Sequence, residues 1–249
     1  MLRLTASVAA AVVAAAASAL LALSSARVVR LSRTELVTAI VLVAVLAAAS
    51  TTAQAVSQWR ARRLGARRDA AAVVLDGAAW AVVDATGLDY RDLGLAAYVV
   101  RRPALAPWTR RLHRVHRVRA RRRPTASGVT WRPGKGVIGA CVEQGQVVAV
   151  DVRADHTAIW PCTREEWETG VVPPEIRLGL TWSEFLDVRE KYDVVVATPM
   201  LDASGPETRV VGCVALDGPA GSLDRLSADD VLALLDSAAT SLLVTARNG

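Results

Sequence analysis

The chain has 249 residues, of which 52% are hydrophobic, with a formal net charge of +6 and three cysteines. This length suits one soluble domain beside a hydrophobic amino-terminal part. The cysteines are odd in number and widely spaced, which excludes a recognisable zinc or disulfide framework.

Two apolar spans without a charged residue open the chain, over residues 5–23 and 36–56. Each is near the roughly 20 residues that a helix needs to cross the hydrocarbon core of a bilayer. A helix is expected because lipid leaves no water to satisfy free backbone groups. The sequence therefore predicts a two-helix transmembrane hairpin within residues 1–56.

Two other interpretations of these spans stay open. Arg3, an alanine-rich stretch and small residues around 17–26 also fit a cleaved secretory signal peptide. In that case the second span would be a single anchor. A buried hydrophobic hairpin inside a soluble core is the third interpretation.

A dense group of arginines follows the second span: Arg60, Arg62, Arg63, Arg67 and Arg68. Positively charged flanks stay on the cytoplasmic side of a membrane. We therefore expect a protein of the cell (inner) membrane with residues 60–249 in the cytoplasm, whether or not the first span is retained.

A second arginine stripe covers residues 101–123, whereas the chain from Glu143 onward is predominantly acidic. Such asymmetry fits a basic face toward anionic lipid headgroups. Nucleic acid is the competing partner, but no nucleic-acid-binding motif accompanies the stripe. The predicted contacts to membrane lipids or a partner protein are Arg60, Arg62, Arg63, Arg67, Arg68, Arg117, Arg119 and Arg121.

The soluble part begins with a connecting and first helix in residues 57–92, which a helical spacing of apolar residues predicts as far as Gly87. Residues 93–249 form the predicted sheet domain. Alternation predicts a strand over residues 93–102, and a second, basic strand is expected over residues 112–122.

Residues 131–151 contain a glycine-rich turn, Gly134-Lys135-Gly136, then a short predicted helix ended by Gly145 and a buried strand. The turn lacks the rest of a nucleotide-binding loop, so a phosphate cradle is not favoured. Further along, the pattern predicts a helix over residues 181–191, strands over 193–201 and 209–217, and a closing amphipathic helix over 227–246.

The turn and helix at residues 134–139, the strand at 193–201 and the strand at 209–217 together resemble the GAF domain family. The resemblance covers residues 57–247. It implies an α+β fold with a mostly antiparallel six-stranded sheet, helices on both faces and a ligand cleft on one side. Members of the family bind cyclic nucleotides, bilins, haem or small metabolites, or make only protein contacts, so the fold does not name a ligand.

In the resembled fold, residues 152–192 would lie over the cleft. This segment supplies the candidate ligand-binding residues Trp160, Cys162, Trp167, Trp182 and Phe185. Aromatic side chains near a cleft can stack on a planar ligand. The alternative is that they form a core beneath a long covering segment.

The sequence does not identify a cofactor. Cys162 follows a proline as bilin-attaching cysteines do, but Thr163 stands where those relatives have histidine. His156 is a candidate haem ligand, although a single loop histidine is usually polar surface. The charged pattern of cyclic-nucleotide-binding members is not recognisable.

The sequence favours a non-catalytic, membrane-anchored sensory or interaction module that dimerises through its terminal helices and signals to a partner. One alternative is a cysteine enzyme like the GAF-fold reductases of free methionine sulfoxide. However, Ile138 stands where that family has one cysteine, and His156 and Cys162 are spaced differently. A membrane-perturbing effector gated by the GAF-like part is the other alternative.

Overall fold

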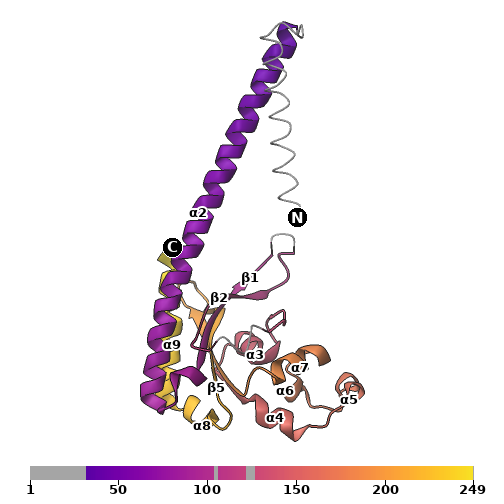
Figure 1. The fold of residues 1–249 in the computed structure, drawn as a ribbon, viewed down its shortest axis with the longest axis vertical. Coiled ribbons are helices and arrows are strands. Elements are labelled where there is room, and N and C mark those ends of the chain that lie inside the picture. The colour runs from indigo at the N-terminus through magenta and orange to yellow at the C-terminus, as the bar shows by residue number, and fades with distance from the viewer. Residues whose placement is uncertain (1–31, 104–105, 122–126, 249) are drawn as a thin grey trace. The chain divides into compact units, whose positions relative to one another are not determined.

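The computed structural model describes residues 32–103, 106–121 and 127–248, and the chain divides into two compact units, Met1–Gly65 and Ala66–Gly249 (Figure 1). Helix α2 (Arg33–Thr86) contributes residues to both units. Among the described residues, one helical segment, Ile40–Trp59, is long and apolar enough to cross a membrane. The first predicted span, residues 5–23, lies outside the described residues, so the structure supports one candidate span and leaves the two-helix hairpin a prediction.

The second unit is built on one antiparallel sheet with the strand order β2-β1-β5-β4-β3. Its strands are β1 (Gly94–Arg101), β2 (Arg111–Arg119), β3 (Val148–Asp151), β4 (Val194–Asp202) and β5 (Arg209–Gly218). The predicted α+β architecture is confirmed, but the described residues form five strands where six were predicted. Trp131 lies beside β2, where its carbonyl accepts a hydrogen bond of 2.9 Å from the Leu112 amide. The residues around Trp131 do not form a sixth strand.

One face of the sheet is covered by α9 (Asp229–Asn248) and the part of α2 within this unit (Figure 1). Leu75, Leu95, Leu216 and Leu235, none of them exposed to solvent, belong to this core. Burying such a side chain contributes about 1.5–3 kcal/mol, so this layer is a main source of stability. Residues 66–86 are therefore part of the sheet domain.

The opposite face carries a layer of five short helices (Figure 1): α3 (Gly136–Gln144), α4 (Val152–Ala158), α5 (Arg164–Thr169), α6 (Pro174–Arg177) and α7 (Trp182–Arg189). The predicted helix before Gly145 is α3, and Gly145 ends it in the left-handed conformation, φ 67°. Two single-turn elements, η1 (Tyr90–Asp92) and α8 (Leu223–Leu226), complete the unit.

The helical layer is held by local capping rather than by helix length. Helices α5 and α7 each begin with a capping box, Thr163 with Glu166 and Thr181 with Glu184. Glu184 also accepts two hydrogen bonds from Lys135 Nζ, at 2.9 and 2.8 Å. Lys135 of the glycine-rich turn therefore ties the start of α3 to α7, which is a structural role.

Candidate functional site

A cavity of about 60 Å³ lies between the sheet and the layer of short helices; we call it the sheet cavity. Its walls are mostly aliphatic side chains from β3, β4, β5, α3 and the α6–α7 region. The groups that can form polar contacts in it include Tyr98, Arg117, Asp155, His156, Tyr192 and Asp217. The cavity thus combines apolar walls with a few polar groups, the usual composition of a small-ligand site.

His156 reaches the sheet cavity from α4, whose first turn is capped by the Asp151 carboxylate accepting from the Ala154 amide, 2.8 Å. The imidazole is 4% exposed and lies edge-on to the Phe185 ring, with 4.5 Å between ring centroids. Burial, aided by the Arg189 charge, lowers the pKa of His156 to about 4, so the ring is neutral near pH 7. Its Nδ1 is buried and has no hydrogen-bond partner among the described residues.

Asp155 precedes His156 on α4 and also lines the cavity. Within the described part of the chain, no cation or hydrogen-bond donor pairs with its side chain. Burial, followed by the neighbouring Asp151 charge, raises the pKa of Asp155. The two adjacent residues therefore offer a ligand one carboxyl group and one neutral imidazole.

A buried ion-pair cluster of Asp217, Arg117 and Arg119 borders the cavity. Asp217 lies 2.5 Å from Arg119 Nη2 and 3.8 Å from Arg117 Nη2, and all three side chains are at most 15% exposed. Burial raises the pKa of Asp217, while Arg119 and then Arg117 oppose that shift.

Strand register explains how this cluster forms. Gly94 of β1 is the cross-strand partner of both Arg119 on β2 and Asp217 on β5. A Cβ atom at position 94 would lie 2.5 Å from Asp217 Oδ1. The missing side chain therefore lets residues two strands apart reach each other across β1.

Tyr98 and Tyr192 supply phenol groups to the same cavity. Tyr98 is 7% exposed, and burial is the largest cause of its raised pKa, so its hydroxyl stays protonated. A protonated phenol can donate a hydrogen bond to a ligand and also accept one.

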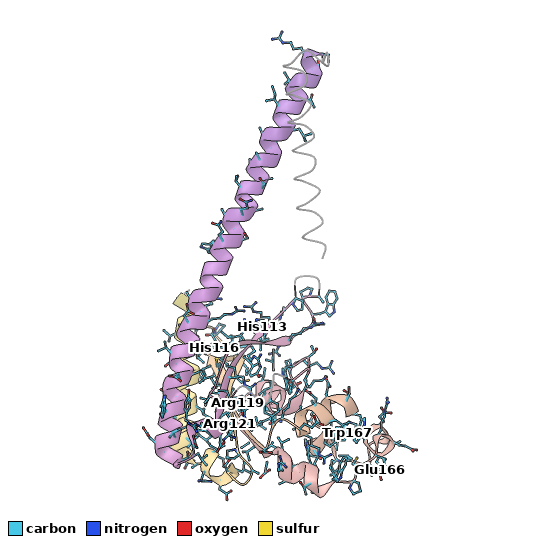
Figure 2. All side chains as sticks on the ribbon, in the orientation of Figure 1. His113, His116, Arg119, Arg121, Glu166 and Trp167 are labelled. Atoms are coloured by element: carbon cyan, nitrogen blue, oxygen red, sulfur yellow. The ribbon has the colours of Figure 1, made fainter. Side chains whose placement is uncertain are left out.

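None of the five predicted ligand-binding residues is among those that line the sheet cavity, so their contact with a ligand stays a prediction. Trp167, Trp182 and Phe185 pack on one another, with centroid distances of 4.2 to 5.9 Å. Trp167, labelled in Figure 2 on α5, also donates from Nε1 to the Leu180 carbonyl at 3.2 Å. These aromatic rings are the core of the helical layer, which was the alternative interpretation.

The other two members of that set are also outside the cavity lining. Cys162 is 7% exposed and belongs to the same core. Trp160 is half exposed and lies under the Arg189 guanidinium, whose Cζ is 3.6 Å from the ring centroid.

The predicted basic contacts separate into two kinds. Figure 2 shows His113, His116, Arg119 and Arg121 following one another along β2 and past its end. Arg117 and Arg119 pair with Asp217, and Arg121 pairs with Asp92 at 3.0 Å. Arg117 and Arg119 therefore serve a buried ion pair, and their predicted contact with lipid or a partner protein stays a prediction.

The remaining basic contacts lie on α2. Arg67 is partly buried and Arg68 is exposed. The side chains of Arg60, Arg62 and Arg63 lie outside the described part of the structure.

The three thiols are buried. Cys141 and Cys213 are fully buried neighbours, and their contact together with burial raises the pKa of Cys213 well above its usual range. Burial and the Glu166 charge raise the pKa of Cys162. A reactive thiol needs a lowered pKa and access to solvent, and these environments supply neither. The described residues contain no group of three side chains that could hold a metal ion.

The sequence interpretation missed Tyr98, Asp155, Tyr192 and Asp217 as cavity residues. One signal was available, because Asp217 is a lone carboxylate at the end of an otherwise apolar strand. A buried carboxylate of this kind requires a partner, but only the strand register identifies Arg119 as that partner.

No protein-family model and no curated protein matches this sequence. Solved structures similar to the chain include the GAF domain region of a putative membrane protein from Geobacter sulfurreducens PCA, at 13% identity, with 73% of this chain and 95% of that chain covered and a TM-score of 0.43. The GAF domain/HD domain protein from Geobacter sulfurreducens is similar at 12% identity, covering 71% and 98%, with a TM-score of 0.35.

A third similar structure is the reduced form of fRMsr from Staphylococcus aureus, at 12% identity, covering 70% and 94%, with a TM-score of 0.37. Two of the three are GAF domain structures, the family that the sequence resembles. These likenesses say nothing about the ligand or the reaction of this chain.

Proposed function

We propose that this protein is a membrane-associated, GAF-type sensory module whose sheet cavity binds a small polar molecule. The observation that carries the proposal is the buried Nδ1 atom of His156, a cavity residue, which has no hydrogen-bond partner in the described part of the chain. Asp155, the preceding residue on α4, also lines the cavity. A buried polar atom left unpaired costs about 1–3 kcal/mol. A ligand that bonds to this nitrogen would recover that cost on binding.

The volume of the cavity limits the size of the ligand that we propose. Sites for drug-sized molecules have volumes of about 300–1,000 Å³. A cavity of about 60 Å³ accommodates a molecule of only a few non-hydrogen atoms. We therefore propose a small metabolite or ion rather than a bilin, a haem or a cyclic nucleotide.

We propose that ligand binding is signalled through α2 and α9, the two helices on the face of the sheet opposite the cavity. Residues 66–86 of α2 and α9 share one core with the strands. A ligand that shifts those strands would change how the two terminal helices pack, and a second copy of the chain or a downstream protein would read that change. The candidate span Ile40–Trp59 supports placement of this module at a membrane.

Native mass spectrometry of the full chain in detergent tests ligand binding directly, because a retained small molecule adds a discrete mass. Thermal unfolding of the same sample against a panel of small metabolites provides the second measurement. A ligand at about 100 times its Kd is expected to stabilise the folded state by about 2.7 kcal/mol. A chain that carries no added mass and gains no stability from any compound would contradict the proposal.

Two variants locate the binding to the cavity. Ala215→Leu fills space in the wall, and Asp155→Asn removes the carboxylate at almost constant size, so both are expected to weaken ligand-induced stabilisation. The control Ala158→Leu makes a similar change on the exposed side of α4 and should leave it unchanged. Equal loss in all three variants would point to general destabilisation.

Burial of all three thiols supports a non-catalytic role. We expect no turnover of free methionine sulfoxide when the full chain is supplied with a thiol reductant, measured as substrate consumption by chromatography. Replacement of all three cysteines by alanine should leave ligand-induced stabilisation in place. Thiol-dependent turnover that the triple variant loses would instead establish the cysteine enzyme.

A further inference from the structure

The arginines of the β1–β2 hairpin fall into two groups. One group forms ion pairs with acidic side chains, and the other has no acidic partner among the described residues. No acidic residue occurs between Asp92 and Glu143. Arg117 and Arg119 form ion pairs with Asp217 of β5, and Arg121 forms an ion pair with Asp92. Near the turn, five exposed arginines have no acidic partner among the described residues: Arg101, Arg102, Arg110, Arg111 and Arg114.

An exposed tryptophan lies in the same turn. Trp108 is 79% exposed, although tryptophan is on average a well-buried side chain. The turn around it is ordered by two backbone bonds, from the Ala106 amide to the Pro103 carbonyl and from the Thr109 amide to the Ala106 carbonyl, each 3.0 Å. We call Arg101, Arg102, Trp108, Arg110 and Arg111 the hairpin tip.

Strand register places like charges opposite each other at the tip. Arg101 of β1 is the direct cross-strand partner of Arg111 on β2, an arrangement that destabilises a sheet. His113 is nearby, and its pKa is lowered by burial and then by Arg101, Arg68 and Arg114. An external anion would relieve this concentration of positive charge.

A hollow of about 420 Å³ lies beside the tip. Arg101, Arg102 and Arg111 line it together with the apolar side chains of Pro103, Leu112 and Val129. A lining that combines guanidinium groups with apolar side chains matches a phospholipid, whose phosphate is anionic and whose glycerol and acyl region is apolar.

We propose that the hairpin tip docks on an anionic bilayer surface, with Trp108 at the headgroup level and the tip arginines on lipid phosphates. Tryptophan is enriched at membrane–water interfaces, and basic residues near an anionic leaflet are attracted to it. The candidate span Ile40–Trp59 brings a bilayer to the same chain. This surface differs from the sheet cavity, and the proposal does not depend on ligand binding there.

The test uses the full chain reconstituted in liposomes of phosphatidylcholine alone or mixed with phosphatidylglycerol. A phospholipid brominated near the headgroup quenches tryptophans that reach the interface. The contribution of Trp108 is the difference between the wild type and Trp108→Phe. Quenching of this component is expected only with the anionic lipid, and it should fall as salt is raised.

The arginines are tested in the same assay. Arg110→Gln and Arg111→Gln are each expected to lower the ratio of docked to undocked tip about fivefold. The matched control Trp160→Phe removes another exposed tryptophan, which lies against Arg189 in the helical layer. This control should leave the anionic-lipid-dependent component unchanged.

Two results would overturn the proposal. One is a Trp108 component that is absent from both liposomes or equal in them. The other is fluorescence anisotropy showing that a labelled single-stranded RNA binds through Arg110 and Arg111 while bromolipid quenching of Trp108 is absent. That second result would assign the tip to nucleic acid.

Discussion

At the scale of single residues, the domain is defined by a few polar groups inside apolar surroundings. His156 is kept neutral by burial, and Asp217 is paired with two arginines that reach it across Gly94. Lys135 and Glu184 similarly form an ion pair with each other. Because each group depends on its partner or on its burial, substitutions at these positions should have effects that neighbouring surface positions lack.

The neutral state of His156 makes the stability of the domain depend on pH. In the unfolded chain its pKa returns to near 6.5, whereas the folded value is about 4. As pH falls, the unfolded state therefore takes up a proton first, and stability that is complete above about pH 6.5 is lost toward pH 4. We expect this loss to be about 1–2 kcal/mol after solvent screening.

Thermal melts of the full chain between these pH values measure the effect. His156→Gln should lose this component of the pH dependence, and Ala158→Gln on the same helix should keep it. A wild type and a His156→Gln variant with parallel pH profiles would show that folding does not shift the pKa of the imidazole.

Asp217 gives a second prediction. Asp217→Asn leaves Arg117 and Arg119 partly buried without their counter-charge, so a loss of about 2–4 kcal/mol in the free energy of unfolding is expected. Asp92→Asn removes the partner of Arg121, whose side chain is 61% exposed, and should cost less than about 1 kcal/mol. Chemical denaturation of both variants measures the difference, and equal costs would contradict the buried cluster.

At the scale of elements, the close approach of neighbouring strands restricts which residues fit. A Cβ atom at Gly212 of β5 would lie 2.1 Å from the Tyr98 carbonyl oxygen and 2.4 Å from Met200 Cε. Gly212→Ala is expected to destabilise the domain by about 2–3 kcal/mol, because backbone has to move. Gly205→Ala, whose nearest contact is at 3.8 Å, should stay within about 0.5 kcal/mol of the wild type in the same melts.

The long or strongly patterned elements could be predicted from the sequence. Alternation identified β1, and the apolar stripe identified α9, because both patterns extend over many residues. Helices α4, α5 and α6 were not predicted, since four to seven residues are too few for a helical period. Their stability comes from caps and from packing against the sheet.

The site was harder to predict than the fold for a related reason. Aromatic residues are conspicuous in a sequence, but their order along the chain does not tell which face of a short helix they occupy. Trp167 and Phe185 therefore looked like ligand contacts and are core. The polar groups of the cavity come from β1, β2, β5, α4 and the turn after α7, and only the tertiary fold brings them together.

At the scale of the whole molecule, the arginines after the candidate span predict a cytoplasmic domain. In bacterial cells, green fluorescent protein fused after Gly249 should fluoresce, and alkaline phosphatase fused at the same position should be inactive. Neutralising Arg60, Arg62 and Arg63 together is expected to weaken this bias. Active phosphatase in the unaltered chain would place the domain on the other side of the membrane.

Strand β2 connects the two proposed events on this domain, ligand binding in the sheet cavity and docking of the hairpin tip on a membrane. Its Arg117 borders the cavity and its Arg111 belongs to the hairpin tip, so one strand carries a group for each site. Coupling between two binding equilibria is reciprocal. Whatever factor a cavity ligand contributes to docking of the tip, an anionic bilayer must contribute to the affinity for that ligand. The lipid composition of the membrane would then set the concentration at which the domain responds.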